Sequence, residues 1–374
     1  MGVVGIAAGA AALAVVAAAT AAGAVVAKKA IHPRPKRTVT AVDVDATSLT
    51  VRSDEQTRCP GVYRVYFDGG QRSILVGDVL SDDGSHVRRK ILGSPAGAPV
   101  PGDDLTWSGY LLDTPGSVSS DFEEVSIAAD GDVRRAWYFP IAGATTWAIH
   151  VHGIHSGRQA ILRAVPDTLS AGMSSLVIGY RGDLEDGRGL PATFGTDEWH
   201  DLDAAMHYAV DHGAERLVLV GWSMGATIAL HAAARSSLRR RIDAMVLICP
   251  ALDWFAALRA GAVKAGFPAF LGTLGALSLT IPGLARVPGL RKAIPMRWMR
   301  PSAPAGLPTL LIHSSGDRDV PIDVSKRFAA TPGAEATLVE IPPCPHGMEL
   351  NRDPALFHGS IAHFLSRGEA LSAA

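Results

Sequence analysis

From about residue 141 onward, the sequence alternates short apolar runs with stretches that carry a helical pattern. The apolar runs are TTWAIHVHG (145–153), SSLVIGY (174–180), RLVLVG (216–221), AMVLIC (244–249) and PTLLIHS (308–314). Between two of them, EWHDLDAAMHYAVDHG places Trp199, Leu202, Met206 and Ala209 on one helical face. This alternation predicts an α/β fold with a mainly parallel sheet flanked by helices. In such sheets the functional groups gather at the carboxyl ends of the strands.

One apolar run ends in a serine between two glycines, in the segment RLVLVGWSMG at residues 216–225. A G-x-S-x-G pattern that follows a strand and opens a helix is typical of a nucleophile elbow. RLVLV precedes the pattern and ATIALHAAAR follows it, so both conditions are met by the predicted elements. Gly221 and Gly225 remove side chains that would collide in such a tight turn. We therefore predict that Ser223 lies at a strand–helix corner and acts as a nucleophile.

A serine hydroxyl needs a base and an acid to become a good nucleophile, here expected in the chain order serine, acid, histidine. Asp317 follows an apolar strand in TLLIHSSGDRDVP, and His346 lies after the next strand in TLVEIPPCPHGMELN. Asp317 would hold the imidazole of His346 in one tautomer. His346 would accept the Ser223 proton and pass it to the leaving group. Asp319 is an alternative acid, and Asp253 is a more distant one.

Together these motifs resemble the α/β-hydrolases over about residues 136–366. The resemblance is carried by HG at 152–153, GWSMG at 221–225, the spacing of His313, Asp317 and Pro321, and His346 followed by Asn351 and Asp353-Pro354. GYRGD at 179–183 and TDEWHDLDAA at 196–205 are similar to segments of bacterial serine hydrolases and prolyl-oligopeptidase-like esterases. Ser314 departs from the family pattern, which more often has glycine there.

The resemblance implies an α/β-hydrolase fold; the helical cap and the N-terminal β region expected with it are inferred from the sequence pattern, and the β region lies outside the resemblance. The resemblance also implies hydrolysis of a carboxylic ester, thioester or amide through an acyl-enzyme, with catalytic roles for Ser223, Asp317 and His346. By analogy with the fold, the oxyanion hole would use the backbone N–H of Met224 and that of Ile154 or Gly153.

Composition and residue pattern divide the chain into three predicted parts. Residues 1–37 are expected to form an anchor and a basic linker, residues 38–135 a β-rich accessory region, and residues 136–374 the hydrolase domain. VTAVDVDATSLTV and GVYRVYF alternate as strands do, and Asp-Gly pairs follow where hairpins would turn, at 68–69, 83–84 and 130–131. We interpret this region as an accessory module or as extra strands on the main sheet, with a dedicated binding module as the alternative.

A segment at about 252–305 interrupts the alternation of strands and helices. Its central part, residues 254–300, is apolar, is broken by prolines, and carries seven basic residues and no acidic one. We predict that it forms a cap over the active site. The same composition would also suit contact with an anionic membrane surface.

The N-terminal residues are apolar, with no charged side chain from Gly2 to Ala27. This length is enough to cross the hydrocarbon layer of a membrane as a helix. The basic residues follow directly, at Lys28, Lys29, Arg34, Lys36 and Arg37. By the positive-inside rule we expect a single-pass anchor with the catalytic domain in the cytoplasm. The alternative is a secretory signal and an extracytoplasmic or secreted domain, because AVVA before Lys28 resembles a cleavage site.

The net charge and the cysteine content argue against nucleic-acid binding, a disulfide framework and a cysteine-based zinc site. A formal net charge of −1 argues against nucleic acid. Cys59, Cys249 and Cys344 are too few and too scattered for a disulfide framework or a CxxC zinc site. Cys249 lies in an apolar run and is expected to be a small buried side chain.

A metal site is the competing interpretation of one histidine-rich stretch. His150, His152 and His155 form the pattern H-x-H-x-x-H, which is also found in binuclear metallo-hydrolases. Such sites need an aspartate before the last histidine, where this chain has Ile154. We therefore expect neither a metal ion nor another cofactor.

The sequence thus predicts a serine hydrolase of the carboxylesterase or lipase type. Its substrate would be a small acyl ester or a lipid-like molecule, and its N-terminal helix would contact a membrane. A peptidase, an amidase or an acyltransferase would use the same three residues, and these activities stay open. A non-catalytic, membrane-tethered interaction protein is the remaining alternative.

Overall fold

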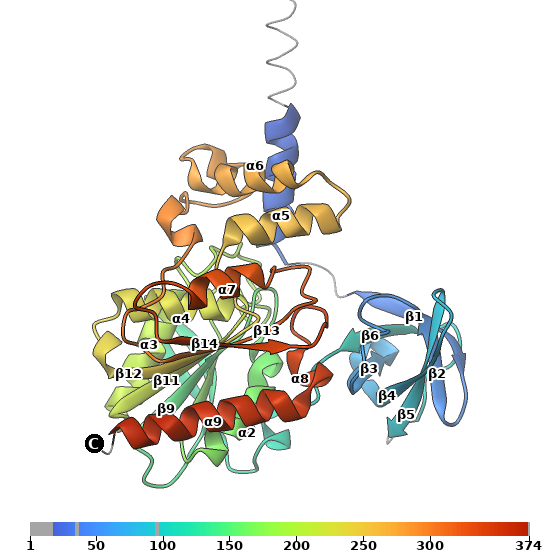
Figure 1. Cartoon of the computed structure of the whole chain (residues 1–374), viewed down its shortest axis with the longest axis horizontal. Helices are drawn as coiled ribbons and strands as arrows, with labels where there is room; N and C mark the ends of the chain where they lie inside the picture. Colours follow the sequence, from blue (N-terminus) through green and yellow to red (C-terminus); the bar gives the residue numbers. More distant parts are fainter. Residues whose placement is uncertain (1–17, 34–36, 94–96, 373–374) are drawn as a thin grey trace, which may run out of the picture.

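The computed structural model describes residues 18–33, 37–93 and 97–372, the last six of these by their backbone only. Two β assemblies organise the described chain (Figure 1). One is a closed barrel built from residues 38–108. The other is an eight-stranded sheet with helices on both of its faces.

The barrel has the strand order β1-β2-β5-β4-β3-β6. Its strands are β1 (Thr38–Val44), β2 (Ser48–Arg52), β3 (Tyr63–Phe67), β4 (Arg72–Asp82), β5 (His86–Gly93) and β6 (Asp104–Ser108). In β3, Tyr63, Val65 and Phe67 are buried and alternate with less buried side chains, because successive strand residues point to opposite faces. Arg89 is fully buried inside the barrel and donates hydrogen bonds to three backbone carbonyls.

The large sheet has the order β14-β13-β12-β11-β9-β10-β8-β7. Its strands are β7 (Glu123–Ala129), β8 (Asp132–Phe139), β9 (Thr146–Val151), β10 (Ser174–Ile178), β11 (Arg216–Trp222), β12 (Ile242–Ile248), β13 (Thr309–Ser314) and β14 (Ala336–Ile341). From β10 to β14 all neighbours pair in parallel, whereas β7, β8 and β10 pair antiparallel. The predicted fold class, a mainly parallel sheet flanked by helices after an N-terminal β region, is confirmed.

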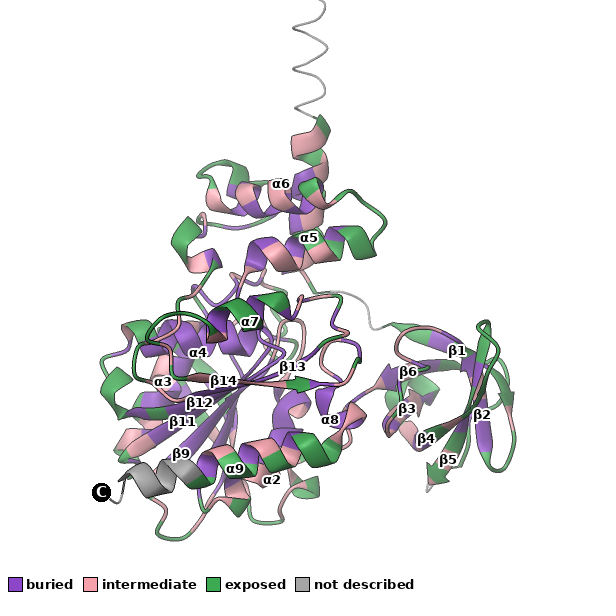
Figure 2. Ribbon diagram, in the orientation of Figure 1, coloured by how far each residue is buried: buried purple, intermediate pink, exposed green. Residues whose placement is uncertain are grey.

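Both faces of the large sheet are covered by apolar side chains. In β11, Leu217 and Leu219 belong to a core with α3 and α4, whereas Val218 and Val220 belong to a core with α9 and the barrel. The central strands are buried along their length (Figure 2). The helices are α2 (Val165–Ser170), α3 (Trp199–Asp211), α4 (Met224–Arg235), α5 (Trp254–Lys264), α6 (Ala269–Thr280), α7 (Asp323–Ala329), α8 (Glu349–Arg352) and α9 (Pro354–Ser372).

The predicted β-rich region, residues 38–135, is shared between the two assemblies. Residues 38–108 form the barrel, while β7 and β8 extend the large sheet at its edge. The predicted division at residue 135 falls inside β8, because the turn at Asp130-Gly131 joins two strands of the same sheet. The structural boundary therefore lies after β6.

The predicted cap segment lies between β12 and β13 and contains α5 and α6. A helix over residues 18–31 crosses α6 and points away from the large sheet (Figure 1). A Cβ added to Gly23 would lie 2.7 Å from the Cβ of Leu274, so the two helices approach closely there. Ala27 and Ile31 are fully buried, and the Ile31 carbonyl accepts a hydrogen bond from the Ala192 N–H.

Most of the predicted membrane span, residues 2–27, lies outside the described residues. Among the helices that are described, none has both the length and the apolar character needed to cross a membrane. The anchor and the cytoplasmic location stay predictions.

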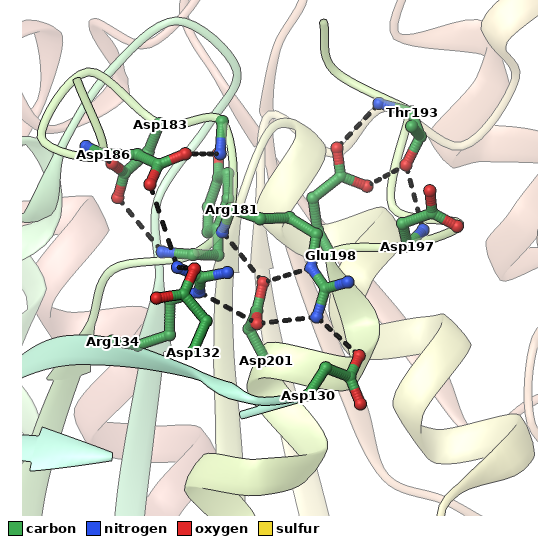
Figure 3. A network of polar contacts seen from close by, with 12 residues as sticks. Asp130, Asp132, Arg134, Arg181, Asp183, Asp186, Thr193, Asp197, Glu198 and Asp201 are labelled. Carbon is green, nitrogen blue, oxygen red and sulfur yellow. Dashed lines mark hydrogen bonds and ion pairs between the residues drawn. The ribbon is translucent and has the colours of Figure 1, made fainter. Parts of the chain in front are cut away.

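A buried ion network holds the long loop between β10 and α3 (Figure 3). Asp201 on α3 has no exposed side-chain surface and accepts two hydrogen bonds from the Arg181 guanidinium, at 2.8 and 2.9 Å. Arg134 on β8 reaches the same carboxylate at 3.1 Å. Glu198 accepts the backbone N–H groups of Thr193 and Gly195. The network therefore ties β8, the loop and α3 into one unit.

We predict that Asp201→Asn lowers the free energy of unfolding by about 3 kcal/mol, because it leaves two arginines without their buried carboxylate. Urea unfolding followed by circular dichroism measures this change. Glu340→Gln is the control, since Glu340 pairs with Lys326 at 3.2 Å on the surface, with both side chains about half exposed. Its loss should be below about 1 kcal/mol. Equal losses in the two variants would contradict the structural role of Asp201.

Candidate active site

Ser223 lies at the corner between β11 and α4, as predicted from its motif. Its backbone has φ 54° and ψ −112°, a region that non-glycine residues rarely adopt. The Ser223 N–H donates to the Ile248 carbonyl at 2.9 Å, and the Ser223 carbonyl accepts the N–H of Ala251. The corner is therefore bonded to the end of the neighbouring strand and to the segment that follows it.

The two flanking glycines are required by close packing. A Cβ added to Gly221 would lie 2.6 Å from the Ala226 nitrogen, and one added to Gly225 would lie 2.1 Å from the Val151 carbonyl oxygen. Both distances are far below ordinary contact, so no larger residue fits without moving the backbone. The G-x-S-x-G pattern thus lets α4 begin directly against the end of β9.

The structure brings the three predicted catalytic side chains together. His346 Nε2 lies 2.8 Å from Ser223 Oγ, and His346 Nδ1 lies 2.6 Å from Asp317 Oδ2. The residues come from three loops at the carboxyl edge of the sheet, after β11, β13 and β14. Ser223 and Asp317 are buried, while the His346 side chain is about one-fifth exposed.

Asp317 is held in one orientation by three further hydrogen-bonding groups. Its Oδ1 accepts the backbone N–H groups of Asp319 and Val320, both at 2.8 Å. Its Oδ2 lies 3.1 Å from Nε2 of His313, whose other ring nitrogen lies 2.7 Å from the Ser325 hydroxyl. With the ring donating to Asp317, the Ser325 hydroxyl donates to Nδ1. The carboxylate can therefore turn little away from His346.

The charges of this pair stabilise each other. Burial alone would raise the pKa of Asp317, but the His346 charge and the hydrogen bonds from His313 and His346 hold it below its usual range. Burial lowers the pKa of His346, but the Asp317 carboxylate outweighs that effect and raises it above the ordinary value for histidine. The imidazole is thus a stronger base than a free histidine.

The two alternative acids have other partners. Asp319 is partly exposed and pairs with Lys264 at 2.8 Å. Asp253 accepts the Ala256 N–H at the start of α5 and pairs with Arg300. Of the three aspartates considered from the sequence, Asp317 is the one hydrogen-bonded to His346.

The segments that carry the predicted oxyanion donors lie next to Ser223. A Cβ on Gly153 would lie 3.2 Å from the Ser223 Cβ, so the HG loop that continues into Ile154 packs against the nucleophile. Met224 is the first residue of α4, and the first N–H groups of a helix have no partner within it. This side of the hydroxyl is therefore suited to a developing negative charge.

The GYRGD segment (residues 179–183) contacts the HG loop and holds it in place. The Tyr180 hydroxyl donates to the Gly153 carbonyl at 2.7 Å, and its ring stacks on His152 at 4.2 Å between centroids. His152 Nε2 lies 3.2 Å from the Asp183 carboxylate, and both side chains are buried. Because the ion network of Figure 3 holds the same segment, it also fixes the loop beside Ser223.

The fold is the same as that of known esterases. Residues 151–275 match the family described as alpha/beta hydrolase fold. The chain has the α/β-hydrolase fold. Similar solved structures include an esterase of Pyrococcus furiosus, at 20% identity over 68% of this chain and 95% of that chain, with a TM-score of 0.52. A hyperthermophilic esterase from Pyrobaculum calidifontis has 17% identity over 71% of this chain and 91% of that chain, with a TM-score of 0.50.

The resemblance inferred from the motifs is thereby confirmed at the level of the fold.

Residues 38–108, which form the barrel, match a domain of unknown function (DUF8805). None of the curated proteins matches this chain.

Two histidines of the H-x-H-x-x-H pattern, His150 on β9 and His152 just after it, have separate partners. His150 Nε2 lies 3.1 Å from the Thr168 hydroxyl, and burial lowers the pKa of His150 to about 3. His152 pairs with Asp183. Within the described ranges, no three histidine, cysteine, aspartate or glutamate side chains are grouped so as to hold a metal ion.

Arg163 is a residue of the site that the sequence reasoning missed. Its guanidinium carbon lies 3.7 Å from the ring centroid of Trp222, the residue before Ser223. One of its nitrogens donates to the Gly347 carbonyl, next to His346, at 2.8 Å. Arg163 thus joins the serine strand to the histidine loop. Its partner Gly347 is 184 positions away, which no local pattern reveals.

The barrel contacts α8, the helix that follows the histidine loop of the α/β-hydrolase domain. Asn351, five positions after His346, donates from its side-chain amide to the Val62 and Gly109 carbonyls at 2.7 and 3.0 Å. A Cβ on Gly61 would lie 2.0 Å from the Asn351 carbonyl oxygen, so the contact is close. The sequence singled out Asn351 as part of a motif, but not this contact with the barrel.

Two further buried groups lie near His346. Burial raises the pKa of the Cys249 thiol to about 12, so the thiol stays neutral. Burial also raises the pKa of Glu349, although the charge of His346 opposes this change. Neither Glu349 oxygen has a hydrogen-bond partner among the described residues.

A large cavity lies in another part of the molecule. It has a volume of about 960 Å³ and is lined by residues near the amino ends of the strands, including Thr146, Asp243 and Ala336. Ser223 lies at the opposite, carboxyl edge of the sheet. This cavity is therefore separate from the candidate active site.

We predict that Asp317→Asn lowers kcat for an ester substrate by about 10³- to 10⁴-fold, because an amide at this position favours the wrong imidazole tautomer. The wild-type activity should fall as the pH drops through the raised pKa of His346, which lies above about 6.5. In Asp317→Asn this fall should move to lower pH, since the carboxylate no longer favours the protonated ring. Steady-state kinetics between pH 5 and 9 measure both effects.

Asp319→Asn is the matched control, because Asp319 neighbours Asp317 in the chain but pairs with Lys264. It should keep both the rate and the pH midpoint of the wild type. A larger loss in Asp319→Asn than in Asp317→Asn would overturn the assignment of the acid.

Proposed function

We propose that this chain is a serine hydrolase that cleaves a carboxylic ester of an acyl or other apolar substrate through an acyl-enzyme. The observation that carries the proposal is the continuous hydrogen-bonded series from Ser223 through His346 to Asp317. The similar solved structures named above are esterases, which agrees with an ester substrate.

In the proposed first step, Ser223 Oγ attacks the ester carbonyl carbon while its proton moves to His346 Nε2. The carbonyl oxygen becomes negative and accepts the N–H of Met224 and that of Ile154 or Gly153. Collapse of this tetrahedral intermediate breaks the bond to the alcohol oxygen. The alcohol takes the proton from His346 and leaves, and the acyl group stays on Ser223.

In the second step, a water molecule attacks the acyl carbonyl and gives its proton to His346. Collapse returns that proton to Ser223 Oγ and releases the carboxylic acid. Asp317 keeps Nδ1 of the imidazole protonated throughout, so that Nε2 is always the atom that exchanges protons. The hydrogen bond of 2.6 Å between Asp317 and His346 suits this role.

The apolar surroundings of the corner support an apolar substrate. Met224, Leu252, Trp254 and Phe255 belong to one buried cluster that joins the start of α4 to the cap. Ile154, from the HG loop, packs against the same cluster. A hydrocarbon chain transferred from water to such surroundings gains about 0.8 kcal/mol for each buried methylene. Longer acyl chains are therefore expected to bind more tightly up to the length of the site.

We predict that Ser223→Ala lowers kcat on p-nitrophenyl butyrate and octanoate by about 10⁴- to 10⁶-fold, because the attacking oxygen is removed. Release of p-nitrophenol, compared with that of p-nitroaniline from the matching anilides, measures the rate and the preference for esters. The wild type should act on the esters faster than on the anilides.

Ser237→Ala is the control, since Ser237 is exposed just beyond the far end of α4. It should retain wild-type rates. Unchanged ester hydrolysis by Ser223→Ala would refute the nucleophile. Faster turnover of the anilides than of the esters would identify an amidase instead.

A further inference from the structure

Exposed apolar side chains gather on the cap. Of the fifteen large apolar residues that are exposed in the described chain, seven lie between residues 263 and 296. Phe267 and Phe270, at the start of α6, are 43% and 57% exposed. Ile281, Leu284 and Val287 follow its end and are 42%, 37% and 65% exposed. Such a concentration is typical of a surface that contacts a partner or a membrane.

Basic residues lie among these apolar ones. Arg286, Arg291 and Lys292 are exposed, and none of them forms an ion pair with any residue that the structure describes. The whole segment from 254 to 300 contains no aspartate or glutamate. The partner of this surface is therefore expected to be anionic as well as apolar, a combination that anionic lipids provide. We call Phe267, Phe270, Ile281, Leu284, Val287, Arg286, Arg291 and Lys292 the cap patch.

The N-terminal helix packs beside the cap patch. The helix over residues 18–31 crosses α6 at Gly23 and Gly275, between the two apolar ends of the cap patch. Its amino end points away from the large sheet (Figure 1). The sixteen residues that precede the described helix, from Gly2 to Ala17, carry no charge. The described part of this helix thus enters the fold beside the cap patch.

We propose that the cap patch docks on the surface of an anionic lipid bilayer. The phenylalanines and aliphatic side chains enter the boundary between headgroups and acyl chains, and the three basic residues contact the lipid phosphates. The carboxyl edge of the large sheet, where Ser223 lies, then faces the membrane across the cap. An apolar substrate dissolved in the bilayer would reach the site without crossing water.

The test places an environment-sensitive dye on the full chain at Val287→Cys, in a Ser223→Ala background so that no lipid is hydrolysed. The described native cysteines are all buried, so the introduced thiol is the reactive one. The control dye position is Arg240→Cys, which lies next to β12 at its amino end, is exposed, and has Arg239 and Arg241 as neighbours. Both proteins are mixed with vesicles of phosphatidylglycerol or of phosphatidylcholine.

The proposal predicts a blue shift of the dye at 287 with phosphatidylglycerol vesicles, a much smaller shift with phosphatidylcholine, and none at 240. A variant that combines Val287→Cys with Arg286→Glu, Arg291→Glu and Lys292→Glu should bind the vesicles more weakly. The phosphatidylglycerol concentration that gives half of the shift should rise by at least about 100-fold. This result is independent of catalysis, and so of the proposed function.

Three results would overturn the proposal. In the first, the protein co-floats with phosphatidylglycerol vesicles but the dye at 287 shows no shift. Membrane binding would then belong to the N-terminal segment alone. Another is an equal shift with both lipids. The third is a shift that grows with protein concentration in the absence of vesicles, which would identify a second copy of this chain as the partner of the cap patch.

Discussion

The whole site depends on one strained corner, where β11 turns into α4 at Ser223. Holding a serine at φ 54° costs on the order of 1–3 kcal/mol, and the surrounding packing must hold it there. Gly221 and Gly225 allow the backbone to approach within distances that any side chain would block. The hydrogen bond from the Ser223 N–H to Ile248 then fixes the corner to the next strand. Only with this backbone does the hydroxyl meet the histidine loop.

The same edge of the sheet is braced from two directions. On one side, the ion network around Asp201 holds the segment whose Tyr180 and Asp183 support the HG loop. On the other, Arg163 joins Trp222 to the histidine loop, and Asn351, on the helix α8 that follows that loop, binds the barrel. The barrel is thus in contact with α8, the helix that follows the histidine loop.

The parts predicted from sequence were those with local patterns. Strand–helix alternation predicted the parallel sheet, and the G-x-S-x-G pattern predicted the corner, because both depend on neighbouring residues. The barrel closure and the extension of the sheet by β7 and β8 depend on pairing between distant strands, which alternation alone cannot assign. Arg163 had no signal, since it lies in a short 3-10 helix (Arg158–Ala164) and acts through residues far along the chain. Asp317 was preferred to Asp319 from its position and motif spacing, and the contacts with His346 and Lys264 support that choice.

Covalent labelling by a fluorophosphonate tests the central claim most directly, because this probe reacts with a serine only when a nearby base activates the hydroxyl. The mass of the folded protein should rise by one phosphonyl group, and fragmentation of its peptides should place that group on Ser223. A folded protein that gains no mass, or that carries the group on another serine, would contradict the account.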